Sequence, residues 1–356
     1  MAGVGLSKAK ETQGFRAVAL QPRPLVMRKL RFQTELCIAS HSPMRCRLEL
    51  LILLIVSAGC NDDAQPELQP VAENKRFKII VTSEPLLQMT QSIVKDAADV
   101  RQIIPDTTTS RDWKPSSSET ASMQQADLIL VSGAGYEPWK DRVSLPGSRV
   151  RDTAAGYYNQ LIRIPDAVTH QHGPDGQHSH PGTVWATWLD PELCMAQLHQ
   201  VSIHCCRLMP DRRQAFETAE AKLSAELNHL NSELALIQAH ILEKSGRTEL
   251  TVFSDAPHYQ YLAQRLGWKL QYLHWLETDT LSDEDRTSLL DAFQQKVENR
   301  PAFFLMNSRR SVADADFVRE SGGTVIRIDL CELPDSKGTS FPARLEQNLR
   351  RIRDAF

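Results

Sequence analysis

The longest regular pattern in the chain is an amphipathic stretch at residues 211–244. Apolar residues recur there at spacings of four and three, which is the spacing of one face of an α-helix. They are Leu223, Leu227, Leu230, Leu234, Ile237 and Ile241. At 1.5 Å per residue, a helix of roughly 30 residues is about 45 Å long. The stripe is too short and isolated to favour a coiled coil. We therefore predict a single stiff spine helix that must bury one face against other elements.

Short apolar runs and helical patterns alternate on both sides of this stretch. Alternation on this scale is typical of βαβ units and parallel sheets. The predicted strands are 77–82, 100–104, 128–131, 250–253, 269–274, 302–306 and 324–328. The predicted helices are 85–98, 119–125, 191–209, 257–265, 285–298, 312–320 and 342–354. The fold class expected is α/β, with two βα lobes joined by one long spine helix.

The segment before the first strand has the layout of a targeting signal. A basic stretch at 44–47 precedes an apolar run at 48–56, and Ser57-Ala58-Gly59-Cys60 closes it with small residues. This is the three-part pattern of a signal peptide, too short to span a bilayer. The closing residues resemble a bacterial lipobox, which implies cleavage before Cys60 and lipidation of that cysteine. The alternative is a buried internal strand or helix.

These patterns give an expected organisation of the whole chain. Its parts are an N-terminal extension and lipoprotein signal peptide at 1–60 (signal proper about 44–59), a tether at 61–76, an N-terminal α/β lobe at 77–208 with a His-rich loop at 169–182, the spine helix at 209–246, and a C-terminal α/β lobe at 247–356.

Charge and motif content exclude several functions. A net charge of −3 gives no reason to expect nucleic acid or an anionic membrane as partner, so any membrane contact should come from the lipid anchor alone. The seven cysteines include no C-x-x-C pair. No G-x-S-x-G, P-loop or H-E-x-x-H motif occurs. We expect no enzyme; a two-lobed α/β enzyme is the least favoured alternative.

A second feature is a cluster of histidines on a Gly- and Pro-containing loop. His170, His172, His178 and His180 form two H-x-H pairs within eleven residues. Neutral imidazole is the commonest protein ligand for zinc, and two such pairs can meet one ion. A mobile, ligand-rich loop before a Trp-rich anchor and a long helix suggests metal capture. The alternative is a solvated surface loop with adventitious affinity.

At this point the chain resembles the cluster A-I, zinc/manganese-type (ZnuA/TroA-like) substrate-binding proteins of ABC importers, over roughly residues 77–355. The motifs that carry the resemblance lie at 126–139, 187–191, 257–263 and 320–323. It implies an extracytoplasmic lipoprotein of the cell envelope, periplasmic or otherwise outside the cytoplasm. It further implies a monomer that captures a divalent metal between its lobes, zinc first and manganese next, for an ABC permease.

The resemblance also implies a pocket of three histidines and one carboxylate, which this chain does not reproduce. The first histidine position is Arg111, the second is Ala186, the third is Ser254 or Ala256, and the carboxylate position is Asn307. A zinc site needs three or four N, O or S donors. A permanently cationic guanidinium at the first position opposes a divalent ion and favours an anion.

Two neighbouring side chains are candidates for a rebuilt site. Asp112 adjoins the first position and His258 follows the third, so both can join the loop histidines around one ion. The alternatives are a turn cap for Asp112 and a solvent-facing helical residue for His258. The alternative function is an altered family member that has lost its metal site and binds another solute, such as an anion through Arg111, or acts as an accessory protein.

Overall fold

The computed structural model describes residues 76–164, 170–171, 177–178, 182–246, 249–275, 280–294 and 302–356. All of them belong to one compact unit, Pro70–Phe356. The signal, Cys60 and the tether lie outside the described residues, as do His172 and His180. No described helix combines the length and the apolarity that crossing a membrane requires.

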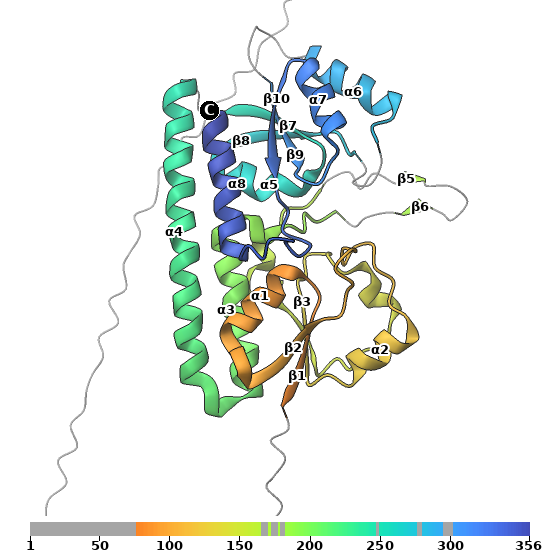
Figure 1. The fold of residues 1–356 in the computed structure, drawn as a ribbon, viewed down its shortest axis with the longest axis vertical. Coiled ribbons are helices and arrows are strands. Elements are labelled where there is room, and N and C mark those ends of the chain that lie inside the picture. Colours follow the sequence, from red (N-terminus) through yellow and green to blue (C-terminus); the bar gives the residue numbers. More distant parts are fainter. Residues whose placement is uncertain are drawn as a thin grey trace, which may run out of the picture. The chain divides into compact units, whose positions relative to one another are not determined.

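Two four-stranded parallel sheets form the two lobes (Figure 1). The N-terminal sheet has the order β2-β1-β3-β4 and the C-terminal sheet the order β10-β9-β7-β8. In each sheet the first strand in sequence lies between the second and the third, so the lobes share one topology although we find no sequence repeat. The strands are β1 Phe77–Val81, β2 Ala98–Gln102, β3 Leu128–Val131, β4 Val150–Asp152, β7 Leu250–Ser254, β8 Trp268–Tyr272, β9 Ala302–Asn307 and β10 Gly323–Ile328.

Helices cover both faces of each sheet. Those in the N-terminal half are α1 Glu84–Val94, α2 Ser117–Gln124, and α3 Pro191–Leu208. Those in the C-terminal half are α5 Gln260–Leu266, α6 Asp283–Gln294, α7 Val312–Glu320 and α8 Phe341–Ala355. A parallel sheet must be covered on both faces, and the continuous burial of strands such as β3 and β9 follows from this.

The predicted spine is α4, Arg213–Ser245, which runs alongside both lobes (Figure 1). All six predicted stripe residues are buried, and Phe216 extends the stripe. They join one apolar cluster that also takes in the inner faces of both sheets, α3 and α8. The helix ends at Gly246, whose φ of 63° is the left-handed conformation that glycine adopts without strain. The spine therefore holds the two lobes through a shared core.

The structure corrects several predicted boundaries and adds elements. The helix expected over 85–98 ends at Val94, because a 3-10 turn and then β2 follow at once. The helix expected from residue 257 begins as a 3-10 turn, Pro257–Tyr259, before α5. The short strand β4 was not predicted, since three half-buried residues give no periodic signal. A two-stranded antiparallel pair, β5 His170–Gln171 and β6 Gln177–His178, was also missed.

Candidate functional site

The carboxyl ends of both sheets meet at the seam between the lobes. In parallel α/β sheets, ligands bind beyond the carboxyl ends of the strands, next to the point where the strand order reverses. Here that point lies between β1 and β3 in one lobe and between β7 and β9 in the other. Hydrogen bonds cross the seam from the Tyr136 hydroxyl to Glu332 (3.1 Å) and from the Trp188 indole to the Leu330 carbonyl (2.8 Å).

An arginine, a tryptophan and a histidine lie against one another in this seam. The Arg111 guanidinium carbon is 5.0 Å from the ring centroid of Trp185, and its Nη1 is 3.5 Å from Nε2 of His258. The Trp185 and His258 rings are 4.5 Å apart. Both rings are buried, and Arg111 is half-buried. We call these three residues the Arg111 stack. It joins the N-terminal lobe to the C-terminal lobe.

The loop between β2 and α2 is held firmly on both sides of Arg111. The hydroxyl of Ser110 accepts a hydrogen bond from the Trp139 indole at 3.1 Å. Trp113 packs edge-on against the same indole, with ring centroids 5.0 Å apart. Both tryptophans belong to the apolar cluster on the outer face of the N-terminal sheet. Arg111 is therefore aimed at the seam by a fixed backbone.

The C-terminal side of the seam carries a buried ion-pair network. Arg310 Nε is 3.3 Å from Asp255 Oδ2, and its Nη1 is 3.2 Å from Asp314 Oδ2. Asp255 Oδ2 also accepts from the backbone N–H of Asn307 at 2.9 Å. The guanidinium faces the ring of Trp275 at 5.3 Å. Removing one member of a buried network leaves an uncompensated charge. Asp255 therefore balances the charge of Arg310 and is a poor candidate for a metal ligand.

The N-terminal side holds a buried acid, Glu137, inside a tight loop that follows β3. Its carboxylate accepts from the Thr82 hydroxyl (2.6 Å) and from the backbone amides of Ser132 (2.7 Å) and Gly133 (3.0 Å). Burial raises its pKa to about 7, although these hydrogen bonds act in the opposite direction. Gly133 has a φ of 77°, and a Cβ there would lie 2.0 Å from Asp152 Oδ1. Only glycine fits this turn.

The five residues matched to the four pocket positions that the resemblance implies offer few donors to an ion. Ala186 and Ala256 are buried and have no polar side chain. The Ser254 hydroxyl donates to the Ala256 carbonyl at 2.8 Å, and Asn307 Oδ1 accepts from the Arg309 amide at 3.0 Å. Arg111 contributes only its positive charge. These residues therefore do not fit a divalent cation.

The two candidates for a rebuilt site lie in different settings. Asp112 is exposed and its carboxylate accepts from the Thr109 hydroxyl at 2.6 Å, which is a local turn contact. His258 is buried in the seam with only 7% of its surface exposed, so it does not face solvent. Within the part of the chain that the structure describes, no group of three His, Cys, Asp or Glu residues could hold a metal ion.

The histidine loop is described only at two short backbone stretches. There His170 pairs directly with His178 in an antiparallel ladder. Residues paired in this way have Cα atoms about 5 Å apart. The hairpin therefore brings one member of each H-x-H motif opposite the other.

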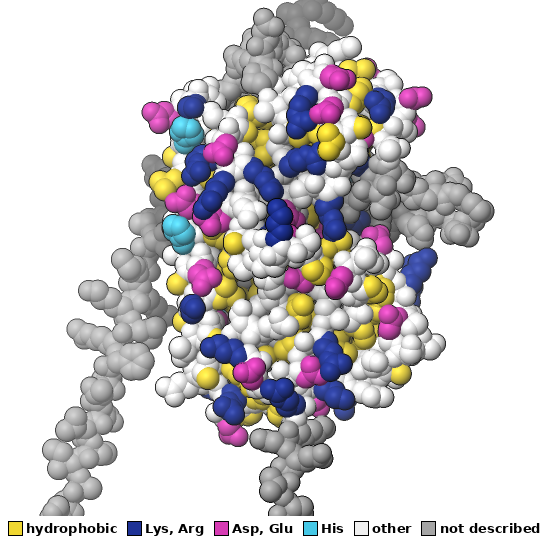
Figure 2. Space-filling view, in the orientation of Figure 1, with side chains coloured by type: hydrophobic (Ala, Val, Ile, Leu, Met, Phe, Trp, Pro, Cys, Tyr) yellow, Lys and Arg dark blue, Asp and Glu magenta, His cyan; other side chains and the backbone are white. Residues whose placement is uncertain are grey.

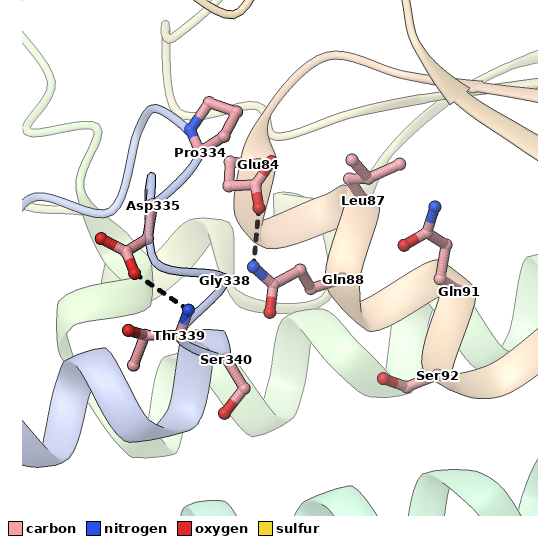
Figure 3. Close-up of a pocket in the computed structure, with 10 residues that line it drawn as sticks. All are labelled: Glu84, Leu87, Gln88, Gln91, Ser92, Pro334, Asp335, Gly338, Thr339 and Ser340. Atoms are coloured by element: carbon pink, nitrogen blue, oxygen red, sulfur yellow. Dashed lines mark hydrogen bonds between the residues drawn. The ribbon is translucent and has the colours of Figure 1, made fainter.

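A separate groove lies between α1 and the segment before α8 (Figure 3). It encloses about 470 Å³ and is lined by Glu84, Leu87, Gln88, Gln91, Ser92, Pro334, Asp335, Gly338, Thr339 and Ser340. The Gln88 amide donates to Glu84 at 2.6 Å, and Asp335 accepts from the Thr339 amide at 2.9 Å. None of the lining residues is a histidine or cysteine. The groove shares no residue with the Arg111 stack or with the Arg310 network.

Sequence reasoning missed several residues that make the seam. Arg310, Glu332 and Glu137 were not singled out, because each is buried and each has a partner distant in sequence, which only the tertiary structure shows. A weak signal was present for Glu137: an acidic residue directly after Gly133-Ala134-Gly135-Tyr136, between an apolar strand and Pro138. Such a residue is well placed to accept hydrogen bonds from the amides of a tight turn.

Comparison with known proteins now places the chain. The model of the family described as "Zinc-uptake complex component A periplasmic" matches residues 79–355. The chain belongs to this family. The resemblance inferred from the sequence motifs is thereby confirmed, together with the two-lobed fold and its spine helix.

Relatives within the zinc-uptake family share about a fifth of their residues with this chain. The high-affinity zinc uptake system protein ZnuA of Bacillus subtilis is 22% identical over 316 residues, which cover 85% of this chain and 94% of that protein. The zinc-binding lipoprotein AdcA of Streptococcus pneumoniae is 22% identical over 289 residues, 78% of this chain and 55% of AdcA. The chain thus spans about half the length of AdcA.

Solved structures of the family show the same fold. Zn(II)-bound AdcA from Streptococcus pneumoniae superposes with a TM-score of 0.63 at 18% identity, covering 79% of this chain and 58% of AdcA. The metal-dependent lipoprotein YcdH from Bacillus subtilis gives 0.62 at 19% identity, covering 78% of this chain and 98% of YcdH.

Proposed function

We propose that the chain is the extracytoplasmic solute-binding component of an ABC-type zinc importer and that it captures zinc on its histidine loop. Membership of the zinc-uptake family and relatives named for zinc binding support the ion and the transport role. The observation that carries the placement is the direct pairing of His170 with His178. Imidazole ligands suit zinc, with manganese, which favours oxygen donors, as the second choice.

The described side chains of the seam do not form a competing zinc site, which supports zinc binding on the histidine loop. The described histidine of the seam, His258, lies against a guanidinium. Its described carboxylates already have partners: Asp255 pairs with Arg310, Glu332 accepts from Tyr136, and Glu137 accepts from Thr82 and two backbone amides. Among the residues that the structure describes, none of these side chains belongs to a group of three His, Cys, Asp or Glu that could hold a metal ion. Capture on the loop needs no donor from the seam.

The proposal includes a place in the cell and a partner. Cleavage before Cys60 with lipidation of its thiol would anchor the chain at the outer face of the cytoplasmic membrane or in the periplasm. AdcA is named a lipoprotein, which supports an anchor of this kind. An ABC permease is the proposed recipient of the zinc. The function is binding and delivery, without catalysis.

Zinc binding by the purified chain tests the proposal. Replacing His170, His172, His178 and His180 by Gln should abolish binding, because neutral amide side chains are poor zinc ligands. The matched control replaces three histidines of α3 and α4, His199, His229 and His240, and should bind as the parent does. Loop binding should also fade below about pH 6, as imidazoles protonate. Zinc content measured after equilibrium dialysis decides the outcome.

A second candidate function is an altered family member that handles no metal. The Arg111 stack favours it, because a cation lies where the family resemblance implies a ligand. This second function is favoured if the parent chain binds neither zinc nor manganese in the same dialysis experiment.

A further inference from the structure

The Arg111 guanidinium is the one positive charge in the Arg111 stack, and the rings around it are those that a cation prefers. It faces Trp185 at 5.0 Å, within the range of a cation–π contact. Tyr136 lies next to Trp185, with ring centroids 5.0 Å apart, and Trp188 lies 5.1 Å from Tyr136. All three aromatic rings are buried. Buried aromatic rings therefore line the seam on the side that faces the Arg111 guanidinium.

The polar groups around Arg111 also suit a positive charge. Its Nη1 approaches His258 Nε2 at 3.5 Å, and an imidazole nitrogen accepts there only when it carries no proton. The Glu332 carboxylate accepts from Tyr136 at 3.1 Å. Both Arg111 and Glu332 act electrostatically on the Tyr136 hydroxyl, with opposite signs. Arg111 and Glu332 thus face one common cluster from opposite lobes.

The second cation of the seam, Arg310, is neutralised by its own carboxylates. Asp255 and Asp314 each pair with it, and its side chain is 2% exposed. Asp255 is therefore not available to balance a further positive charge. A divalent ion beside Arg111 would meet a fixed cation without a free carboxylate partner from Asp255.

We propose that Arg111 is a specificity-determining residue: its guanidinium fills the inter-lobe seam as a built-in cation and thereby excludes divalent metal ions from it. The inference rests on the proposed function, because it concerns which part of a zinc-binding chain takes the ion. On this proposal the seam only joins the two lobes, and zinc binds to the histidine loop.

The test uses the full chain with the four loop histidines replaced by Gln, so that only the seam can bind. In that background Arg111→His is compared with Arg111→Lys. With Arg111 intact, we expect fewer than about 0.1 zinc ions per chain after dialysis against micromolar zinc. Arg111→His removes the fixed charge and adds a ligand beside His258, so zinc content should rise at least about tenfold. Arg111→Lys keeps the charge and should stay at the background value.

Three outcomes overturn the proposal. One is a full zinc equivalent in the background chain with Arg111 intact, and another is equal binding by the Lys and His variants. The third is a folded Arg111→His chain that stays at the background value. Circular dichroism and gel filtration establish folding. If Arg111→His does not fold, Arg111→Cys replaces it, because it also removes the fixed charge and adds a zinc ligand, and the same rise in zinc content is expected. A parent chain without zinc contradicts the proposed function but leaves the contrast between the His and Lys variants as a test of Arg111.

Discussion

The Tyr136 hydroxyl of the N-terminal lobe donates to the Glu332 carboxylate of the C-terminal lobe at 3.1 Å, and both residues are buried. Burial, followed by the nearby charge of Glu332, raises the pKa of Tyr136 well above its ordinary value, so the phenol keeps its proton. Together with the Arg111 stack, this bond joins the two lobes across the seam. On the face shown in Figure 2, basic and acidic side chains are interspersed over both lobes.

Tyr136→Phe removes this inter-lobe bond and leaves the ring in place. We expect a loss of about 1–2 kcal/mol in the free energy of unfolding, because a buried carboxylate loses a donor. Urea denaturation measures it. Tyr158→Phe is the matched control: this tyrosine is 52% exposed, and its hydroxyl donates to Asp152 where water can replace it, so stability should change by less than about 0.5 kcal/mol. Equal effects from the two substitutions would contradict the role given to Tyr136.

Glu137 should make stability depend on pH. Burial raises its pKa from 4.5 to about 7, so the folded chain holds this proton more tightly than the unfolded chain. The resulting stabilisation is complete below pH 4.5 and is lost as the pH rises through 7. Between about pH 5 and pH 8, the parent should lose about 2–3 kcal/mol that the Glu137→Gln variant does not lose.

Denaturation curves at several pH values separate this effect from general pH sensitivity. The exposed Glu226 on α4 supplies the control, since Glu226→Gln should keep the pH dependence of the parent. If Glu137→Gln keeps it too, the buried carboxyl does not titrate in this range.

Leu230 tests the spine helix as a shared core. It is 3% exposed on α4, whereas Leu236 on the same helix is 64% exposed. Leu230→Ala should cost about 2–5 kcal/mol, because it leaves a cavity against packed neighbours. Leu236→Ala should change stability by less than about 0.5 kcal/mol. Thermal denaturation of the pair gives the answer, and similar melting temperatures would count against the shared core.

Cys60 tests the proposed anchor. In a bacterium that processes lipoproteins, Cys60→Ala should give uncleaved precursor or protein released from the membrane fraction. Cys46→Ala, upstream of the apolar run, should leave membrane attachment unchanged. Fractionation and mass spectrometry of the N-terminus measure both. A parent chain recovered intact and soluble from Met1 onward would rule out the anchor.

Local patterns were sufficient for most of the fold. The apolar strands, the stripe on α4 and the turn at Gly246 each depend on residues close together in sequence. Predictions failed where an element depends on residues distant in sequence. The three half-buried residues of β4 form a strand only because β3 lies beside them. The early end of α1 likewise follows from β2 pairing with β1.

The sequence by itself determined the two-lobed α/β class, the spine helix, the family and the absence of the implied metal ligands. Only the tertiary structure showed that Arg111 meets His258, 147 residues away, and that Glu137 is buried among backbone amides. The physical reason is that periodicity encodes which face of an element is apolar, whereas a site forms where distant loops converge. Which charges neutralise each other there depends on contacts that no local pattern records.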